Sequence, residues 1–264
     1  MAHFWKIFIP PLCLAAALAS PASGQGTYTV RAVRDGGTVK GTVKIGGTSP
    51  RAVAEAVTKD AAWCGRTKPP ARLLVGAGGG VKNAVVYIER IAGGKEFPSG
   101  SVAVLHQHKC EYVPHVLLMT PAMCMEIVNE DPILHNVHGY QSGTATRSLF
   151  NIAQPVKGQR TRIGQEQLTG VGDVFTTCDA GHPWMSAYII RARHPYYAVT
   201  DADGKFELDN VPPGTYVLEM WHEGVAVRSS GGGAGTHPVV EEPYELSQAV
   251  EVTLGGTHVI NFSL

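Results

Sequence analysis

Apolar and polar residues alternate along most of the chain with the period of a β-strand. Residues 38–45 (TVKGTVKI) alternate, and residues 83–89 (NAVVYIE) are rich in β-branched side chains. Because successive side chains of a strand point to opposite faces, this pattern predicts half-buried strands. Further strands are expected at 101–105, 115–119, 123–128, 171–177 and 187–192. Gly, Pro or Asn separates most of these segments, and the spacing favours an all-β fold built as sandwiches.

A second group of strands begins near His194. Residues 197–200 and 205–208 flank the sequence Asp-Ala-Asp-Gly at 201–204, which predicts a hairpin turn. More strands are expected at 216–221, 250–254 and 258–264, with a Gly-rich loop at 229–235. We therefore predict one domain at 25–194 and a smaller one at 195–264. Residues 36–43 could begin the first domain or add a strand to the second.

The composition agrees with short strands joined by tight turns. The 264 residues include 31 Gly and 17 Pro, and 44% of them are hydrophobic. Only the short, Ala-rich segment 51–62 is predicted to be helical. The formal net charge is 0, so no basic excess points to nucleic acid as a partner.

Residues 1–24 have the features of a secretory signal peptide. Lys6 precedes an apolar core at 7–18, and Ala22-Ser-Gly24 is a small-residue cleavage site that makes Gln25 the first mature residue. Two prolines interrupt the apolar core, whereas a membrane anchor needs about 18 or more unbroken apolar residues. We expect a periplasmic or secreted protein with no transmembrane segment after cleavage.

Four cysteines remain after this cleavage. Cys64 and Cys110 lie in turn-like contexts, and an oxidising compartment permits them to form a disulfide. Closing the loop between residues 64 and 110 with a disulfide stabilises the fold by about 4 kcal/mol in the chain-entropy model. Cys124 lies in a strand-like segment and is expected to be a buried small apolar residue outside any disulfide.

The fourth cysteine begins the segment with the most chemistry. Cys178, His182 and Met185 bring a thiolate, an imidazole and a thioether into eight residues, and His135 supplies a second imidazole. Two His and one Cys with a weak axial Met form the ligand set of a blue-copper electron-transfer centre. We expect Cys178 as the thiolate ligand, His135 and His182 as equatorial ligands, and Met185 as the axial ligand.

Asn136 follows the first of these histidines and has an expected role of its own. Its backbone N–H can point at the thiolate, and its side chain can tie the two ligand segments together. Two alternatives remain for the four residues. The first is a buried cysteine among core histidines, and the second is a zinc site, which the thioether of Met185 disfavours.

A second group of candidate ligands lies at His106, His108, Cys110 and His115. It could form an accessory metal site. Alternatively, it is one half of a disulfide among exposed histidines. Both interpretations stay open at the level of the sequence.

Several stretches resemble known families. They are YVPHV at 112–116, LHNVH at 134–138, HPWM at 182–185, PYYAVTD at 195–201 and FELDNVPPGTY at 206–216. Residues 110–193 resemble the plastocyanin, pseudoazurin and amicyanin family of cupredoxins. The whole chain is similar to a bacterial group labelled methylamine-utilisation or plastocyanin-like proteins. The resemblance implies a cupredoxin Greek-key β-sandwich followed by a carboxypeptidase regulatory-like domain, a smaller transthyretin-like sandwich with a carbohydrate-binding-like fold.

The ligand segment departs from this family in one respect. Short-loop cupredoxins usually have two residues between Cys and His, whereas Cys178 and His182 are separated by three. That spacing matches the binuclear copper motif of cytochrome oxidase subunit II. The motif needs another Cys four positions earlier, where this chain has Val174, so one mononuclear copper site is predicted.

The resemblance implies an exported type 1 copper protein that carries single electrons and is not an enzyme. His182 would be the exit for the electron, because the loop histidine reaches the surface in that family. A c-type cytochrome or a dehydrogenase would be the redox partner. The alternatives are a copper storage or handling protein and an envelope adaptor module, with Tyr196, Tyr197 and Trp221 as ligand-facing or core aromatics.

Overall fold

The computed structural model describes most of the chain after the predicted signal peptide. The described residues are 28–47, 54–69, 72–100, 102–142, 147–168, 172–224, 227–229, 239–240 and 243–264. The predicted signal peptide at 1–24 lies outside them, as does nearly all of the Gly-rich segment predicted at 229–235. Within the described residues, no helix is long and apolar enough to cross a membrane.

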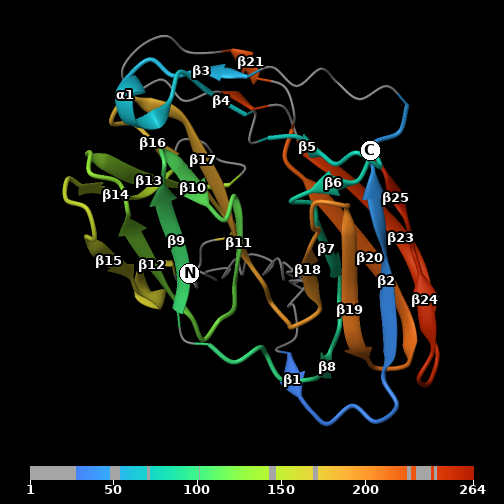
Figure 1. Ribbon diagram of the computed structural model, residues 1–264. Coiled ribbons are helices and arrows are strands. Elements are labelled where there is room, and N and C mark those ends of the chain that lie inside the picture. Colours follow the sequence, from blue (N-terminus) through green and yellow to red (C-terminus); the bar gives the residue numbers. More distant parts are fainter. Residues whose placement is uncertain are drawn as a thin grey trace, which may run out of the picture.

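The described residues are almost entirely β-structure, which confirms the predicted fold class. Figure 1 shows the strands gathered into two sandwiches that lie side by side. One sheet of the first sandwich has the order β10 (Glu111–Val113), β9 (Val102–His108), β12 (Cys124–Asn129), β15 (Arg160–Ile163). Its other sheet has the order β11 (Val116–Met119), β17 (His182–Arg191), β16 (Val174–Cys178), β13 (His135–Gln141), β14 (Ser148–Gln154). Leu105, Ile127 and Ile189 are among the buried side chains of its core.

The second sandwich combines strands from both ends of the described chain. One sheet has the order β18 (Tyr197–Val199), β7 (Val85–Ile88), β20 (Gly214–His222), β23 (Tyr244–Val252). The other contains β19 (Lys205–Val211), β2 (Gly37–Lys44) and β24 (Thr257–Val259), and β25 (Phe262–Ser263) also pairs with β2. Of the two placements considered for residues 36–43, the pairing of β2 supports the second. β7, which the predicted division at residue 195 puts in the first domain, likewise pairs with β18 and β20.

An apolar layer joins the two sandwiches. Tyr188 and Ile190 on the outer face of β17 form a buried cluster with Val85 of β7, and Trp221 of β20 packs against it. The rings of Tyr188 and Trp221 meet edge to face with centroids 5.0 Å apart, a favoured geometry for aromatic pairs. The sheet of the first sandwich that contains β17 is therefore covered on its outer face by the sheet of the second sandwich that contains β7 and β20.

Short elements complete the described chain. Pairs of short strands are β1 (Thr29–Val30) with β8 (Gly93–Gly94), β3 (Glu55–Ala56) with β4 (Thr67–Lys68), β5 (Leu74–Val75) with β6 (Val81–Lys82), and β21 (Val227–Ser229) with β22 (Val239–Val240). The helices are α1 (Ala61–Cys64) and a 3-10 turn, η1 (Gln165–Leu168).

The predicted helix at 51–62 is wrong in its described part. Residues 51–53 lie outside the described residues, Glu55 and Ala56 form β3, and only the last two positions belong to α1. A helix of this length is marginal without tertiary support. The segment is instead held by pairing with β4 and by the cysteine that ends α1. We call residues 54–69 the strap.

The turn at Asp201–Gly204 is present, but it does not close a hairpin. Gly204 adopts a positive φ of 75°, and its N–H donates to the carbonyl of Asp201 at 3.0 Å. The flanking strands β18 and β19 belong to opposite sheets of the second sandwich. The hairpin prediction fails because each strand has a longer-range partner, β7 for one and β2 for the other.

Candidate metal centre

The fold brings together three of the four predicted ligands. His135 begins β13, Cys178 ends β16 and His182 begins β17. One ligand atom from each lies within 4.8 Å of the others, and all three residues are buried. The two Nδ1 atoms are 3.3 Å apart, and Nδ1 of His182 is 3.6 Å from Sγ of Cys178.

Strand pairing explains why these residues meet. Cys178 and His182 face each other across the short turn that joins β16 to β17, where Gly181 adopts a φ of 98° that suits glycine. β13 runs antiparallel to β16, with His138 opposite Thr177, so the beginning of β13, which carries His135, lies near the end of β16. Neither β13 nor the first five residues of β17 was predicted from the pattern.

Carboxylates orient both imidazoles. Nε2 of His135 lies 2.8 Å from Oδ2 of Asp131, and Nε2 of His182 lies 2.9 Å from Oδ2 of Asp60. An ionised carboxylate only accepts hydrogen bonds, so each Nε2 carries the proton and each Nδ1 keeps its lone pair. Both lone pairs are therefore held ready for a metal ion beside the sulfur of Cys178.

Asp131 is held in its charged form. Although burial acts to raise its pKa, hydrogen bonds from His135, from the backbone N–H groups of Cys110 and Lys109, and from Trp63 bring it well below the ordinary value. For His182, burial lowers the pKa, and the hydrogen bond to Asp60 opposes this only in part. The imidazole of His182 is therefore neutral, as a metal ligand requires.

The thiol of Cys178 and Asn136 form a linked pair. Burial raises the pKa of Cys178, while the backbone N–H groups of Asn136, Ala180 and His182 oppose the rise. Oδ1 of Asn136 lies 3.3 Å from Sγ and accepts a 2.7 Å hydrogen bond from the backbone N–H of Ala180. Both contacts predicted for Asn136 are thus present, to the sulfur and between the ligand segments. A metal ion would displace the thiol proton on binding.

Met185 lies in β17 and is buried in the same apolar cluster as Cys178. Apolar side chains therefore surround the sulfur end of the site, while carboxylates lie on its imidazole end. A dry environment of this kind controls solvent access and tunes the potential of a bound metal ion.

The strap closes the site over His182, and the expectation that this residue reaches the surface is wrong. His182 has 0% exposure, because Asp60 covers its outer edge and Nζ of Lys59 donates to the carbonyl of Ala180 at 2.6 Å. The predicted disulfide between Cys64 and Cys110 is confirmed. It ties the strap to the turn between β9 and β10. The family that the chain resembles exposes this histidine, and that resemblance could not reveal the cover over His182. The residues that form the cover, Lys59 and Asp60, lie far from His182 in the chain.

A second group of potential ligands shares one histidine with this site. It consists of Cys110, Asp131 and His135. Cys110 is bonded to Cys64, so its sulfur is not a thiolate ligand, and Asp131 instead serves His135 as a hydrogen-bond acceptor. This carboxylate lies four residues before the histidine and could have been suspected from the sequence. Asp60 carries no local signal.

The cluster predicted around residue 110 does not stay together. Cys110 forms the disulfide, and His115 is buried elsewhere, where its Nδ1 donates to the carbonyl of Ser186 at 2.9 Å and its Nε2 contacts Glu223. Only His106 and His108 remain near each other, on β9. Cys124 is outside any disulfide, as expected, but it is half-buried rather than buried.

Similarity to known proteins is partial. A family model described as polysaccharide lyase family 4, domain II, matches residues 178–258. No curated protein matches the sequence. Among solved structures, a Cu-containing nitrite reductase from Thermus scotoductus SA-01 is 21% identical over 37% of this chain and 24% of that chain, with a TM-score of 0.28. The chain thus spans about a quarter of the length of that reductase.

Two smaller proteins match the same share of the chain. Amicyanin from Paracoccus versutus is 20% identical over 37% of this chain and 86% of that chain, with a TM-score of 0.29. A purple cupredoxin from Nitrosopumilus maritimus is 17% identical over 35% of this chain and 100% of that chain, with a TM-score of 0.27. Each similarity covers little more than a third of the chain.

Proposed function

We propose that the chain binds one copper ion through His135, Cys178 and His182, with Met185 as a weak axial ligand, and carries single electrons. The observation that supports this most directly is the orientation of the donors. Two imidazoles turn Nδ1 toward one buried sulfur, while carboxylates hold their opposite nitrogens. Thiolate and thioether donors suit Cu(I), and imidazoles serve copper in either oxidation state.

The chain's own residues would do two things for such an ion. The β16–β17 turn and β13 hold the donors in place before the metal binds, which limits the rearrangement on oxidation and reduction. The strap and the apolar cluster exclude water, so no coordination position is open to a substrate. A bound copper ion would supply a one-electron couple. We therefore propose a carrier rather than an enzyme.

We propose that the protein works outside the cytoplasm. The disulfide between Cys64 and Cys110 supports this, because disulfides persist in oxidising compartments. Its 46-residue sequence separation corresponds to about 4 kcal/mol of stabilisation in the chain-entropy model. A c-type cytochrome or a dehydrogenase would exchange electrons with it there.

Native protein is expected to bind one copper ion at this centre, and Val174→Cys is expected to leave that number unchanged. Val174 and Cys178 are the two ends of β16, and a strand rises about 3.3 Å per residue. A thiolate at 174 would lie roughly 13 Å along the strand from Cys178, too far to bridge two ions. Electron paramagnetic resonance should give a four-line copper pattern for both proteins. A seven-line pattern in either protein would contradict a mononuclear site.

Copper storage or handling is a second candidate, and the closed strap favours it. A protein that holds copper under a cover would release it slowly to chelators and would exchange electrons slowly. Stopped-flow reduction of the Cu(II) form by a small reductant separates the two. Reduction that is complete on the stopped-flow timescale supports a carrier. Reduction that is slower than the transfer of copper to a chelator supports storage.

An adaptor function of the second sandwich is the weakest candidate. The polysaccharide lyase domain match at 178–258 is the observation in its favour. The aromatic side chains considered as ligand contacts argue against it, because they pack inside the protein. Tyr196 is buried, Tyr197 stacks on Tyr87 with ring centroids 4.7 Å apart, and Trp221 packs on Tyr188. Retention on immobilised glycans would support the adaptor function.

A further inference from the structure

His106 and His108 form, with Glu130, a cluster on the surface of the first sandwich. The histidines are two positions apart on β9, so both side chains leave the same face of the sheet. β12 runs parallel to β9, and Glu130 follows its last residue. The backbone N–H of Glu130 donates to the carbonyl of Gln107 at 2.9 Å. This bond sets the carboxylate between the two imidazoles.

Each imidazole meets a different oxygen of this carboxylate. Nδ1 of His106 is 2.7 Å from Oε1, and Nδ1 of His108 is 3.0 Å from Oε2. Among the described residues, no lysine or arginine forms an ion pair with Glu130, and Arg160, which lines the same pocket, is paired with Glu126. The two imidazoles are therefore the partners described for this carboxylate.

We propose that His106, His108 and Glu130 bind a divalent transition-metal ion such as Zn²⁺ or Cu²⁺. Two imidazoles and a carboxylate are ligands that these ions accept, and no thiolate takes part. Atoms that are each about 2.1 Å from one ion lie about 3 Å apart when their bonds are at right angles. The two nitrogen–oxygen distances already have this length.

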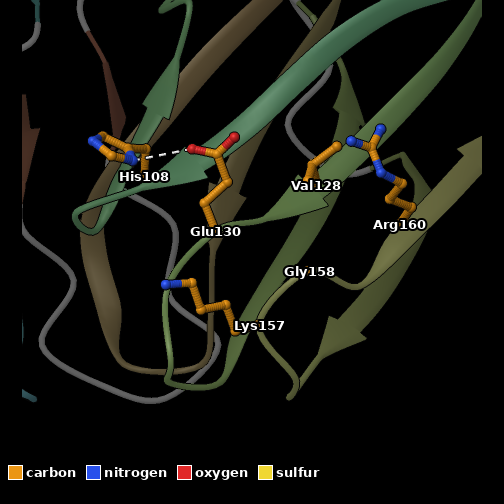
Figure 2. A pocket seen from close by; sticks show the side chains of 6 residues that line it. All are labelled: His108, Val128, Glu130, Lys157, Gly158 and Arg160. Carbon is orange, nitrogen blue, oxygen red and sulfur yellow. Dashed lines mark ion pairs between the residues drawn. The ribbon is translucent and has the colours of Figure 1, made fainter.

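The metal ion takes the place of the two bridging protons. The imidazoles have to swing toward each other for both to reach one ion. Partial exposure allows this, because the side chains of His106, His108 and Glu130 are 38%, 53% and 38% exposed. His108 and Glu130 line a shallow pocket of about 400 Å³, and Figure 2 shows their side chains pointing toward one another. The pocket leaves room for water to complete the coordination.

This site is separate from the buried centre and does not depend on its function. It uses surface side chains, no sulfur and none of the residues proposed to hold copper. Zn²⁺ is the suitable probe, because it does not oxidise the thiol of Cys178. Any zinc that enters the buried centre contributes equally to all variants and cancels in their comparison.

Isothermal titration with Zn²⁺ tests the site on the mature full-length chain. The unmodified protein should bind one more equivalent than the double variant His106→Gln/His108→Gln. Glu130→Gln should weaken binding of that equivalent at least tenfold. His258→Gln, which removes a half-buried histidine from β24 of the other sandwich, is the matched control and should bind as the unmodified protein does.

Three outcomes would overturn the proposal. They are an unchanged number of equivalents in the double variant, an unchanged affinity in Glu130→Gln, and an equal loss in His258→Gln. Because the substituted side chains of the cluster are partly exposed, the variants should unfold at the temperature of the unmodified protein. If the double variant loses zinc binding and also unfolds at a lower temperature, its loss of binding does not test the site. Glu130→Gln, with an unchanged unfolding temperature, is then the deciding measurement.

Discussion

Cu(II)-loaded protein should show an intense visible band, and Cys178→Ser should abolish it. The band arises from charge transfer between a thiolate sulfur and copper, and Cys178 is the cysteine that lies in one group with both His135 and His182 among the described residues. Serine is close in size, so the buried position should tolerate it and the fold should persist. An absorption spectrum before and after mild reduction measures the effect, since reduction bleaches the band in the unmodified protein.

Cys124→Ser is the matched control for this experiment. Cys124 lies on β12, is half-buried and is not part of a disulfide, but it does not belong to the group around His135. This variant should keep the full band. A colourless Cu(II) form of the unmodified protein, or a band that survives in Cys178→Ser, would show that the copper assignment is wrong.

Asp60→Asn should raise the reduction potential of the copper centre. The Asp60 carboxylate, 2.9 Å from Nε2 of His182, places negative charge close to the metal position and favours Cu(II) over Cu(I). Its removal should shift the ratio of the two forms at a fixed potential by about tenfold, which for one electron is about 59 mV. The effect is limited by solvent, because the side chain of Asp60 is 33% exposed. Redox titration followed at the visible band measures the shift.

Asp60 is the better choice for this test than Asp131. Asp131 also binds the backbone N–H groups of Lys109 and Cys110, so its substitution would disturb the turn that carries the disulfide. Asp203→Asn is the control, because it removes an exposed carboxylate from the second sandwich and should leave the potential unchanged. A potential that stays constant or falls in Asp60→Asn would mean that the strap covers His182 without tuning the metal.

Most strands could be predicted because their signal is local. Alternation and β-branched residues located β2, β7, β9, β11 and β12 within a few positions. β10, β14 and β15 were missed, as were β13 and the beginning of β17. In the last two, the residues that bind or orient a metal, among them His135, Asn136 and His182, are polar and do not alternate. The ligand residues interrupt the pattern that would otherwise mark these strands.

The helix at 51–62 and the hairpin at 201–204 failed for the opposite reason. Each had a local signal that a distant partner overrode. Pairing of β3 with β4 and the disulfide at Cys64 replaced most of the helix. Pairing of β18 with β7 and of β19 with β2 separated the strands on either side of the turn.

Residue types and local patterns were enough to predict the β-class of the fold, the candidate ligands and the cysteines that pair. These follow from residue type and from patterns within short segments of the chain. The assembled fold was needed to show that β2 and β7 join the second sandwich and that Asp60 covers His182. Such contacts join residues more than a hundred positions apart, and their free energy comes from burial and strand pairing that exist only once the sheets have assembled.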